Sequence, residues 1–446
     1  MKRYWLETYG CQMNKAESGA LELELKARGW QPADCLDQAD LVILNTCSVR
    51  ETAEQRVWGR LGFFKAEKRR ARTSGRSFRL ALMGCMAERL KERIVQQAPH
   101  VDLLAGTFQK HRLLDALERE PPDEERGALS LTGREEYRFA AGHHLGGLQA
   151  LVPIMHGCQN YCSYCVVPLV RGPEVSRSPQ AVLAEIEALQ RGEAPVRDIT
   201  LLGQNVNSYR YAVDGGETLR FPGLLRLVLA RLRGQAWLRF LTSHPKDVSP
   251  ELIAVLAEGG ALCPHLHLPV QHGSNRILQA MNRGYTRERY LELVGVIRES
   301  VPEITLTTDI LIGFPGETEE DFRRTVELME QVRFDDAFTY RYNPREGTAA
   351  YALGDDVPEQ VKRDRLTEVI RLQRRITRER KLARLGRSVE VLVESRSKND
   401  PNELLGRTAS DETVVFAGPP RRIGSFCRVL LTELRGGTYA GRELEG

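Results

Sequence analysis

Apolar runs alternate with longer amphipathic stretches through the first hundred residues. The segments RYWLETYG, LVILNTC and LALMGC each have the length of a buried strand, and helical spacing follows each of them. A fourth apolar run, VDLLAGT, lies at residues 101–107. This alternation predicts an N-terminal α/β domain with a parallel sheet over residues 1–120.

A second alternating region follows residues 121–148, whose prolines, acidic run and glycines predict a linker. Its apolar runs predict a partial (β/α)6 barrel over residues 149–380. The predicted strands are residues 151–156, 198–203, 237–242, 265–270, 304–313 and 335–342. The predicted helices are residues 179–191, 223–233, 249–259, 274–299 and 318–331.

The last sixty residues change character. Short β-branched runs such as VEVLVES and ETVVFAG are broken by Gly, Pro and Asn-Asp turns. Five strands of this kind predict a small C-terminal β-barrel over residues 381–446, similar to barrels that bind oligonucleotides. A plain structural cap is the alternative.

Charge is informative locally rather than in total. The net charge of +4 is too small to identify a nucleic-acid-binding protein. Residues 60–79 carry eight basic side chains against one acidic, and residues 362–387 carry eleven against three. Such runs suit a polyanion, although two solvated helix faces would have the same composition.

The chain shows no sign of export or of membrane insertion. Its first residues lack the apolar core of a signal peptide, and no stretch of about 18 apolar residues occurs. We therefore expect a cytoplasmic protein that does not associate with membranes. Nine cysteines in a reducing compartment favour metal or redox ligands over disulfides.

Three cysteines stand close together in MHGCQNYCSYCVVPLVRG, directly after a predicted strand. Cys158, Cys162 and Cys165 have the spacing C-x3-C-x2-C. Three thiolates can hold three irons of a 4Fe-4S cluster and leave the fourth iron open, whereas structural zinc needs a fourth ligand. His156 is the one local candidate for that zinc ligand, and unliganded buried cysteines are a further alternative.

An open iron can chelate the amino and carboxylate groups of S-adenosylmethionine. Reductive homolysis of its sulfonium then gives an adenosyl radical, which removes hydrogen from carbon positions that acid/base catalysis cannot activate. Tyr164, just before the last cysteine, could pack on the adenine or could simply pack within its loop.

Three further cysteines each follow one of the first three strands. Because ligands bind at the carboxyl edge of open parallel sheets, Cys11, Cys47 and Cys85 could meet at one point there. Simple burial of three thiols is the alternative. The other cysteines show no such relation and are interpreted as structural thiols: Cys35, Cys263 and Cys427.

Several separate segments resemble the methylthiotransferases of the radical S-adenosylmethionine superfamily, over essentially the whole chain. ETYGCQMN, LNTCSVRE and MGCMAER are similar to the auxiliary-cluster domain of that family, the central cysteine motif to its radical domain, and residues 388–446 to its RNA-binding TRAM domain. LLGQNVNSY, HLPVQHGSNRILQAMNRGYT, TDILIGFPGETEEDF and NPREGT add to the resemblance.

The resemblance implies two 4Fe-4S clusters, one on the central cysteines and an auxiliary one on Cys11, Cys47 and Cys85. In the family, the auxiliary site carries a sulfur that one S-adenosylmethionine methylates, and a second is cleaved to the radical that activates the substrate. LLGQNVNSY resembles the branch that converts N6-isopentenyladenosine, next to the anticodon of tRNA, to its 2-methylthio derivative. Sister branches act on threonylcarbamoyl-adenosine or on an aspartate of a ribosomal protein.

Other residues at strand ends are candidates for contact with the cofactor or substrate, although caps and ion pairs are also common there. Asp309 is the strongest, because its apolar neighbours imply an inward-pointing carboxylate. The candidates are Gly203, Gln204, Asn205, Ser243, Gln271 and Asp309, with Arg171 and Arg177 after the cysteine loop. The departures from the family pattern are Pro173, His272, Asn343 and Glu346.

We expect a monomer that works on the anticodon loop of tRNA with an electron-donor protein and a sulfur donor. An unpaired loop base can be splayed out for chemistry at modest cost. A non-enzymatic alternative is an iron-sulfur redox sensor that binds RNA. It would explain the cysteines and the charge, but not a partial barrel that carries an open-iron motif.

Overall fold

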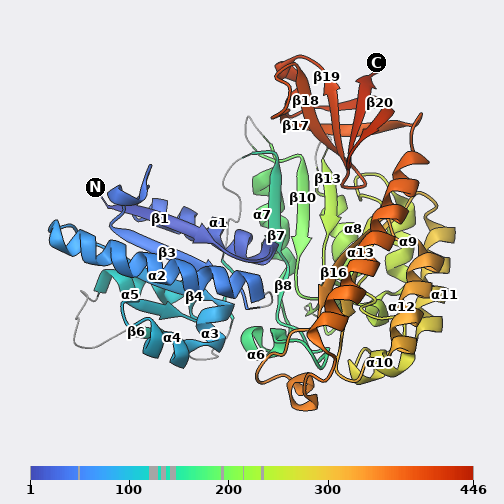
Figure 1. Cartoon of the computed structure of the whole chain (residues 1–446). Coiled ribbons are helices and arrows are strands. Elements are labelled where there is room, and N and C mark those ends of the chain that lie inside the picture. Colours follow the sequence, from blue (N-terminus) through green and yellow to red (C-terminus); the bar gives the residue numbers. More distant parts are fainter. Residues whose placement is uncertain are drawn as a thin grey trace.

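The computed structural model describes residues 2–48, 51–119, 129–131, 137–140, 147–191, 195–213, 215–232 and 236–444. Figure 1 shows an N-terminal sheet with its helices, a central partial barrel, and a small barrel at the C-terminal end. The predicted α/β fold class is therefore confirmed. Most of the predicted linker at residues 121–148 lies outside the described residues.

The N-terminal sheet is parallel and has the strand order β2-β1-β3-β4-β5-β6. Its strands are β1 (Arg3–Thr8), β2 (Gln31–Pro32), β3 (Leu41–Thr46), β4 (Arg79–Gly84), β5 (Leu103–Ala105) and β6 (Leu129–Leu131). Its helices are α1 (Gln12–Ala27), α2 (Glu51–Thr73), α3 (Cys85–Arg89), α4 (Lys91–Gln97) and α5 (Leu113–Arg119).

Both faces of this sheet are covered, which explains its nearly continuous apolar strands. Val42 and Leu44 of β3 pack in one core with Phe64 of α2, while Leu41 and Ile43 pack in another core on the opposite face. The short outer strands β2 and β6 are missing from the sequence prediction because two or three residues show no periodicity.

The partial barrel consists of two parallel three-stranded sheets, β13-β10-β7 and β14-β15-β16, linked by a bridge between Leu238 and Leu262. All six predicted strands are present: β7 (Gln149–Pro153), β10 (Asp198–Leu202), β13 (Trp237–Phe240), β14 (His265–His267), β15 (Thr305–Ile312) and β16 (Asp336–Arg341). Two-strand additions flank them: β8 (Met155–His156) with β9 (Val175–Ser176), and β11 (Arg210–Ala212) with β12 (Thr218–Arg220).

Helices cover the outside of the partial barrel and bury one large apolar core against its strands. They are α7 (Pro179–Leu189), α8 (Phe221–Leu229), α9 (Pro250–Glu258), α11 (Arg287–Ser300), α12 (Glu319–Val332) and α13 (Glu359–Leu382), whereas the short helices α6 (Val167–Arg171) and α10 (Asn275–Ala280) lie outside this core. None of the helices in the described residues is long and apolar enough to cross a membrane.

The single helix predicted at residues 274–299 is wrong, because the structure divides it into α10 and α11. Asn282 and Gly284 between them adopt left-handed backbone angles, with φ of 56° and 71°, which end a right-handed helix. The hydroxyl of Thr286 then accepts a hydrogen bond from the backbone N–H of Arg289 at 3.3 Å and starts the second helix.

The C-terminal barrel is closed, with the order β17-β18-β19-β21-β20. Its strands are β17 (Ser388–Arg396), β18 (Glu403–Thr408), β19 (Thr413–Ala417), β20 (Phe426–Arg435) and β21 (Thr438–Glu443). The predicted small β-barrel is confirmed.

The C-terminal barrel sits on the amino-terminal ends of the partial-barrel strands (Figure 1). Arg239 of β13 donates to the backbone oxygens of Thr408 and Ala409, at 2.8 and 2.7 Å, and to the carboxylate of Asp198 at 3.0 Å. Trp237 packs edge-on against Phe426, with ring centroids 4.8 Å apart. The opposite, carboxyl edge of the strands is therefore left for the cysteine loops.

Candidate functional site

The N-terminal cysteines leave neighbouring strands at the same edge of the sheet. Cys11 lies between β1 and α1, Cys47 directly follows β3, and Cys85 begins α3 directly after β4. The strand register pairs Thr8 with Asn45 and Thr46 with Gly84, so the three chain segments turn away side by side. Parallel-sheet topology thus brings together cysteines that are more than 35 residues apart in sequence.

Contacts between these cysteines show how close they are. A Cβ atom on Gly10 would lie 2.6 Å from the Cβ of Cys47, so the residue before Cys11 has to be glycine. A hydrogen bond with Cys47 lowers the pKa of the Cys11 thiol to about 6. Burial raises the pKa of Cys85, against the attraction of the Arg171 guanidinium. Cys47 and Cys85 are buried and Cys11 is exposed, so solvent reaches one side of the trio.

Two asparagines brace this edge of the sheet. Asn14 accepts a hydrogen bond from the backbone N–H of Cys11 at 3.3 Å, and its amide donates to the side-chain oxygen of Asn45 at 3.0 Å. Asn45 in turn donates to the backbone oxygen of Asn14 at 2.8 Å. Both asparagines are fully buried. Sequence reasoning did not select them, although they stand in the ETYGCQMN and LNTC segments.

A buried ionic cluster joins the N-terminal sheet domain to the partial barrel. Arg171, at the end of α6, donates to the carboxylate of Glu17 on α1 at 2.8 Å, and Lys110 pairs with the same carboxylate. Although burial acts in the opposite direction, Arg171 and Lys110 lower the pKa of Glu17 to about 2. The charge of Arg171 also acts on Cys11 and Cys85. The sequence candidate Arg171 therefore acts on the N-terminal cysteine trio from the end of α6, and the next residue, Gly172, accepts the backbone hydrogen bond of Cys158.

His156 is also part of this contact between the domains. Arg171 lies 3.3 Å from its Nδ1, and the ring of Tyr137 stacks on it with centroids 3.6 Å apart. Burial holds the pKa of His156 well below its usual value, so the ring is neutral. No group of three or more His, Cys, Asp or Glu side chains in the described residues could hold a single metal ion.

The central cysteines lie on a loop that follows β8 and ends at α6. Cys158 donates its backbone N–H to the oxygen of Gly172 at 3.2 Å, and the N–H of Cys165 donates to the oxygen of Cys162 at 2.9 Å. Burial raises the pKa of Cys158 to about 11 and that of Cys165 to about 12. Such thiols are poor nucleophiles when free, and a bound cation would be needed to keep them as thiolates.

Neighbouring segments hold this loop in one conformation. Gly157 has φ of 80°, and a Cβ there would lie 2.0 Å from the backbone oxygen of Pro173. Its N–H donates to the side-chain oxygen of Gln204 at 2.6 Å. Gln204 is thus placed as a support of the cysteine loop. Gly203 packs closely as well, since a Cβ on it would lie 2.4 Å from Met155.

Arg283 is a site residue that sequence reasoning missed. It is buried between α10 and α11, and its Nη1 lies 3.2 Å from the Sγ of Cys162 and 3.5 Å from the hydroxyl of Tyr164. A guanidinium donor at this distance stabilises a thiolate or a cluster sulfur. Tyr164 itself packs beside a small apolar cluster that contains Met281 and Leu311. The MNRGYT segment that supplies Arg283 was the available signal.

Unsatisfied polar atoms gather at the carboxyl ends of β10 and β13. Asn205, Ser243 and His244 are each at least 95% buried, yet Asn205 Oδ1, Ser243 Oγ and His244 Nε2 have no partner among the described residues. The two loops meet where Val206 donates to the oxygen of Thr242 at 2.9 Å. Because buried polar groups are rarely left unpaired, this edge fits a polar ligand such as S-adenosylmethionine.

The remaining strand-end candidates lie on β15 and on the loop beside it. Gln271 has φ of 71° and exchanges backbone hydrogen bonds with Asp309 and Leu311 at 2.9 and 2.8 Å. The Asp309 carboxylate is one-quarter exposed and lies 3.6 Å from His267 Nε2. The Asp309 carboxylate is thus partly accessible and lies beside His267.

The departures from the family pattern fall on structural contacts or on the surface. His272 is fully buried between Glu317 and Thr325, both 3.2 Å from its ring nitrogens. Asn343 donates to Glu51 of α2 at 2.6 Å and so links the partial barrel to the N-terminal domain. Pro173 and Glu346 are exposed.

The other candidates lie away from both trios. Arg177 is buried in an ion pair with Glu185 of α7, which gives it a structural role. Of the three cysteines interpreted as structural thiols, Cys263 and Cys427 are buried and Cys35 is exposed.

Comparison with known protein families divides the chain into three matches. Residues 152–329 match the Radical SAM superfamily, and residues 3–106 match a family described as uncharacterized protein family UPF0004. Residues 383–442 match the TRAM domain. The three matches coincide with the partial barrel, the N-terminal sheet domain and the C-terminal barrel.

Proteins similar to this chain over nearly its whole length include several named tRNA-2-methylthio-N(6)-dimethylallyladenosine synthase. The protein of that name from Treponema pallidum is 49% identical over 98% of this chain and 97% of its own length. The proteins from Treponema denticola and Bacteroides fragilis are 46% and 43% identical, and they are covered to 98% and 96%.

Solved structures of lower identity share the fold. The cobalamin-dependent S-adenosylmethionine radical enzyme OxsB aligns with a TM-score of 0.53 and 13% identity, over 84% of this chain and 56% of that one. The radical S-adenosylmethionine methyltransferase TsrM from Kitasatospora setae aligns with a TM-score of 0.52 and 17% identity, over 79% and 77%.

Proposed function

Because this chain belongs to the family of tRNA-2-methylthio-N(6)-dimethylallyladenosine synthases, we propose that it transfers a methylthio group to C2 of N6-isopentenyladenosine next to the anticodon of tRNA. The observation that carries this proposal is that the chain holds two cysteine trios on two packed domains, and that Arg171, at the end of the helix after the central trio, pairs with Glu17 and acts on Cys11 and Cys85 of the N-terminal trio. One trio suits radical generation and the other suits sulfur delivery.

Each trio fits a 4Fe-4S cluster with an open iron. Cys158, Cys162 and Cys165 would hold the radical cluster, and the N-terminal trio would hold the auxiliary cluster. When bound, these clusters and S-adenosylmethionine supply an adenosyl radical and the sulfur and methyl group that the product acquires. The protein's own contribution is to hold, orient and shield these groups.

Several side chains would hold and orient these groups at the loop that carries the central cysteines. Arg283 donates to Cys162 and adds positive charge beside the thiolates. The unsatisfied atoms of Asn205, Ser243 and His244 would bind polar groups of S-adenosylmethionine. His244 suits an uncharged contact, since burial lowers its pKa to about 2 and keeps its ring neutral.

Contacts between the domains hold the N-terminal cysteine trio and the central cysteine trio in one structure. The Glu17–Arg171 ion pair and the bond from Asn343 to Glu51 fix the N-terminal domain against the partial barrel. A substrate carbon held between the trios would face the radical source from one side and the sulfur source from the other. This positioning is what a two-centre reaction requires.

We also propose an electron-donor protein and a sulfur donor as partners, action on the anticodon loop, and a monomer that works in the cytoplasm, where its substrate occurs. A loop base is accessible without breaking a duplex. The same reaction on threonylcarbamoyl-adenosine or on a ribosomal-protein aspartate is tested by offering those substrates in parallel.

The two trios give separable defects. In anaerobically reconstituted protein, Cys158→Ala should abolish formation of 5′-deoxyadenosine, while Cys11→Ala should retain it and form no 2-methylthio nucleoside. Cys35→Ala is the matched control, because Cys35 is exposed and lies outside both trios. Mass spectrometry of digested tRNA measures the product. Full product formation by Cys11→Ala would refute the auxiliary-cluster assignment.

A further inference from the structure

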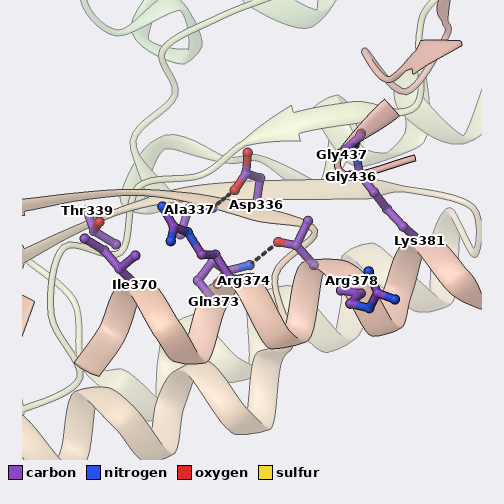
Figure 2. Close-up of a pocket in the computed structure, with 11 residues that line it drawn as sticks. Asp336, Ala337, Thr339, Ile370, Gln373, Arg374, Arg378, Lys381, Gly436 and Gly437 are labelled. Carbon is purple, nitrogen blue, oxygen red and sulfur yellow. Dashed lines mark hydrogen bonds between the residues drawn. The ribbon is translucent and has the colours of Figure 1, made fainter. Parts of the chain in front are cut away.

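A basic groove runs between the partial barrel and the C-terminal barrel, away from the cysteine edge. It has a volume of about 480 Å³ and lies between β16, one face of α13 and the turn that joins β20 to β21. Figure 2 shows Arg374, Arg378 and Lys381 of α13 along one wall, Asp336 of β16 opposite, and Gly437 at the end. No residue that we assign to the proposed reaction lines it.

Several arginines of α13 are paired with carboxylates, whereas the two that line the groove are not. Arg365 pairs with Glu317 at 2.8 Å, Arg375 with Glu330 at 3.1 Å and Arg380 with Asp335 at 2.7 Å. Arg374 and Arg378 face the groove, are exposed, and form no ion pair or hydrogen bond with any described residue. Two guanidinium charges of α13 that no described carboxylate neutralises therefore face the groove.

The resulting charge balance in the groove is positive. Three cationic side chains face a single carboxylate, that of Asp336, which accepts a hydrogen bond from the N–H of Ala337 at 2.9 Å. Arg374 and Arg378 are four residues apart, a rise of about 6 Å along one side of a helix. Lys381 is held at the end of the groove by its bond to the oxygen of Gly437 at 2.6 Å. This row of fixed positive charge suits an extended polyanion.

An unpaired hydrogen-bond acceptor in the same groove, the side-chain oxygen of Gln373, favours RNA over other polyanions. Gln373 is 96% buried, and its amide nitrogen donates to the oxygens of Phe334 and Thr377 at 2.9 and 3.0 Å. Its side-chain oxygen has no partner among the described residues. A phosphate diester has no proton to donate to that oxygen, but the ribose 2′-hydroxyl does, and only RNA carries this group.

We propose that the basic groove binds the ribose-phosphate backbone of the tRNA substrate, with Arg374 and Arg378 each on one phosphate and Gln373 accepting from a 2′-hydroxyl. This inference rests on the proposed function, which supplies the RNA. It places a substrate contact on α13 of the partial barrel, outside the segment that matches the TRAM domain.

Salt-dependent binding tests the phosphate contacts. The holoenzyme is titrated with full-length tRNA that carries N6-isopentenyladenosine, at several salt concentrations. Each lost phosphate contact should reduce the slope of log Kd against log salt by about 0.7 to 0.9 and weaken binding about fivefold at 0.1 M salt. Arg374→Gln with Arg378→Gln should therefore weaken binding about 25-fold. Arg375→Gln, on another face of the same helix, should change neither quantity.

A nucleic-acid comparison tests Gln373. DNA of the tRNA sequence serves as the competitor, and the ratio of RNA to DNA affinity should fall in Gln373→Met and stay constant in Arg375→Gln. If the arginine double variant binds tRNA with the slope and Kd of the unmodified protein, the groove does not bind RNA. Unchanged tRNA binding together with loss of protein-donated electron transfer would show instead that it docks an acidic protein, which also overturns the proposal.

Product formation and tRNA affinity separate the proposed reaction from RNA binding by the basic groove. At saturating tRNA the double variant should form the 2-methylthio product at the unmodified rate, because the groove lies away from the cysteine edge. Absence of product in the unmodified protein refutes the proposed function. Product formation with unaltered tRNA affinity in the double variant refutes the groove and leaves that function intact.

Discussion

The contact that fixes the C-terminal barrel depends on one buried arginine, and Arg239→Met should destabilise it strongly. Side-chain exposure is 6% for Arg239 and 3% for Asp198, so removal of the guanidinium leaves a buried carboxylate without its partner. That change costs about 3–5 kcal/mol. The backbone oxygens of Thr408 and Ala409 lose their donors as well. We expect the free energy that holds the C-terminal barrel against the partial barrel to fall by at least about 4 kcal/mol at pH 7.

The stability of the Arg239→Met variant should depend on pH in a defined direction. Burial raises the pKa of Asp198, and Arg239 opposes that rise. Without Arg239 the pKa rises further, so the folded variant binds a proton that the unfolded chain releases. Its stability should therefore recover as the pH falls below 7, by up to about 1.4 kcal/mol per pH unit. The unmodified protein should show a smaller dependence over the same range.

Hydrogen exchange of the segment at residues 404–416, with urea unfolding followed by fluorescence, measures the effect. Asp198→Asn combined with Arg239→Met removes the unpaired charge and should restore at least about 2 kcal/mol. Arg407→Met is the control, since Arg407 is one-third exposed, and its loss should cost less than about 1 kcal/mol. A loss in Arg239→Met no larger than in Arg407→Met, or one that is independent of pH, would refute the reasoning.

Two further perturbations follow from the site. Gly157→Ala should displace the cysteine loop and lower the iron content of the reconstituted protein towards that of Cys158→Ala, because a Cβ would lie 2.0 Å from the Pro173 oxygen. Gly75→Ala is the control, since Gly75 also has a positive φ but no atom lies within 4 Å of the added Cβ. Full iron content in Gly157→Ala would contradict the prediction. Arg171→Met should cost about 3 kcal/mol in urea unfolding, and Glu17→Gln should cost less in that variant than in the unmodified protein, where Glu17 pairs with both Arg171 and Lys110. A loss in the double variant equal to the sum of the losses in the two single variants would show that the two side chains are not coupled.

Hydrophobic periodicity was sufficient to predict the main strands of both α/β regions, although not the short outer strands β2 and β6, and the strand ends indicated the edge that carries the N-terminal cysteines. The strand-end rule also placed Cys11, Cys47 and Cys85 together, because parallel neighbours end side by side. The break between α10 and α11 was not predicted, since left-handed angles at Asn282 and Gly284 interrupt an otherwise continuous helical pattern. Local patterns identify elements more readily than the turns between them.

The contacts between domains were beyond sequence reasoning. Arg171 was a candidate, but its pairing with Glu17 depends on how two separately folded domains pack, which no local spacing encodes. The same holds for Arg283, whose position beside Cys162 requires a loop and a turn 121 residues apart to meet. The free charge of Arg374 could not be distinguished from that of Arg375 until the neighbours of α13 were known.

The C-terminal barrel and the cysteine loops lie at opposite ends of the partial-barrel strands, so the length of these strands sets the distance between them. The barrel sits at the amino-terminal ends of strands whose carboxyl ends carry the cysteines (Figure 1). The eight residues of β15 extend about 26 Å between those ends. On the proposed function, an RNA held at one end must span that length to present a base at the other. Distance along the RNA, fixed by the strands themselves, then selects which nucleotide is modified.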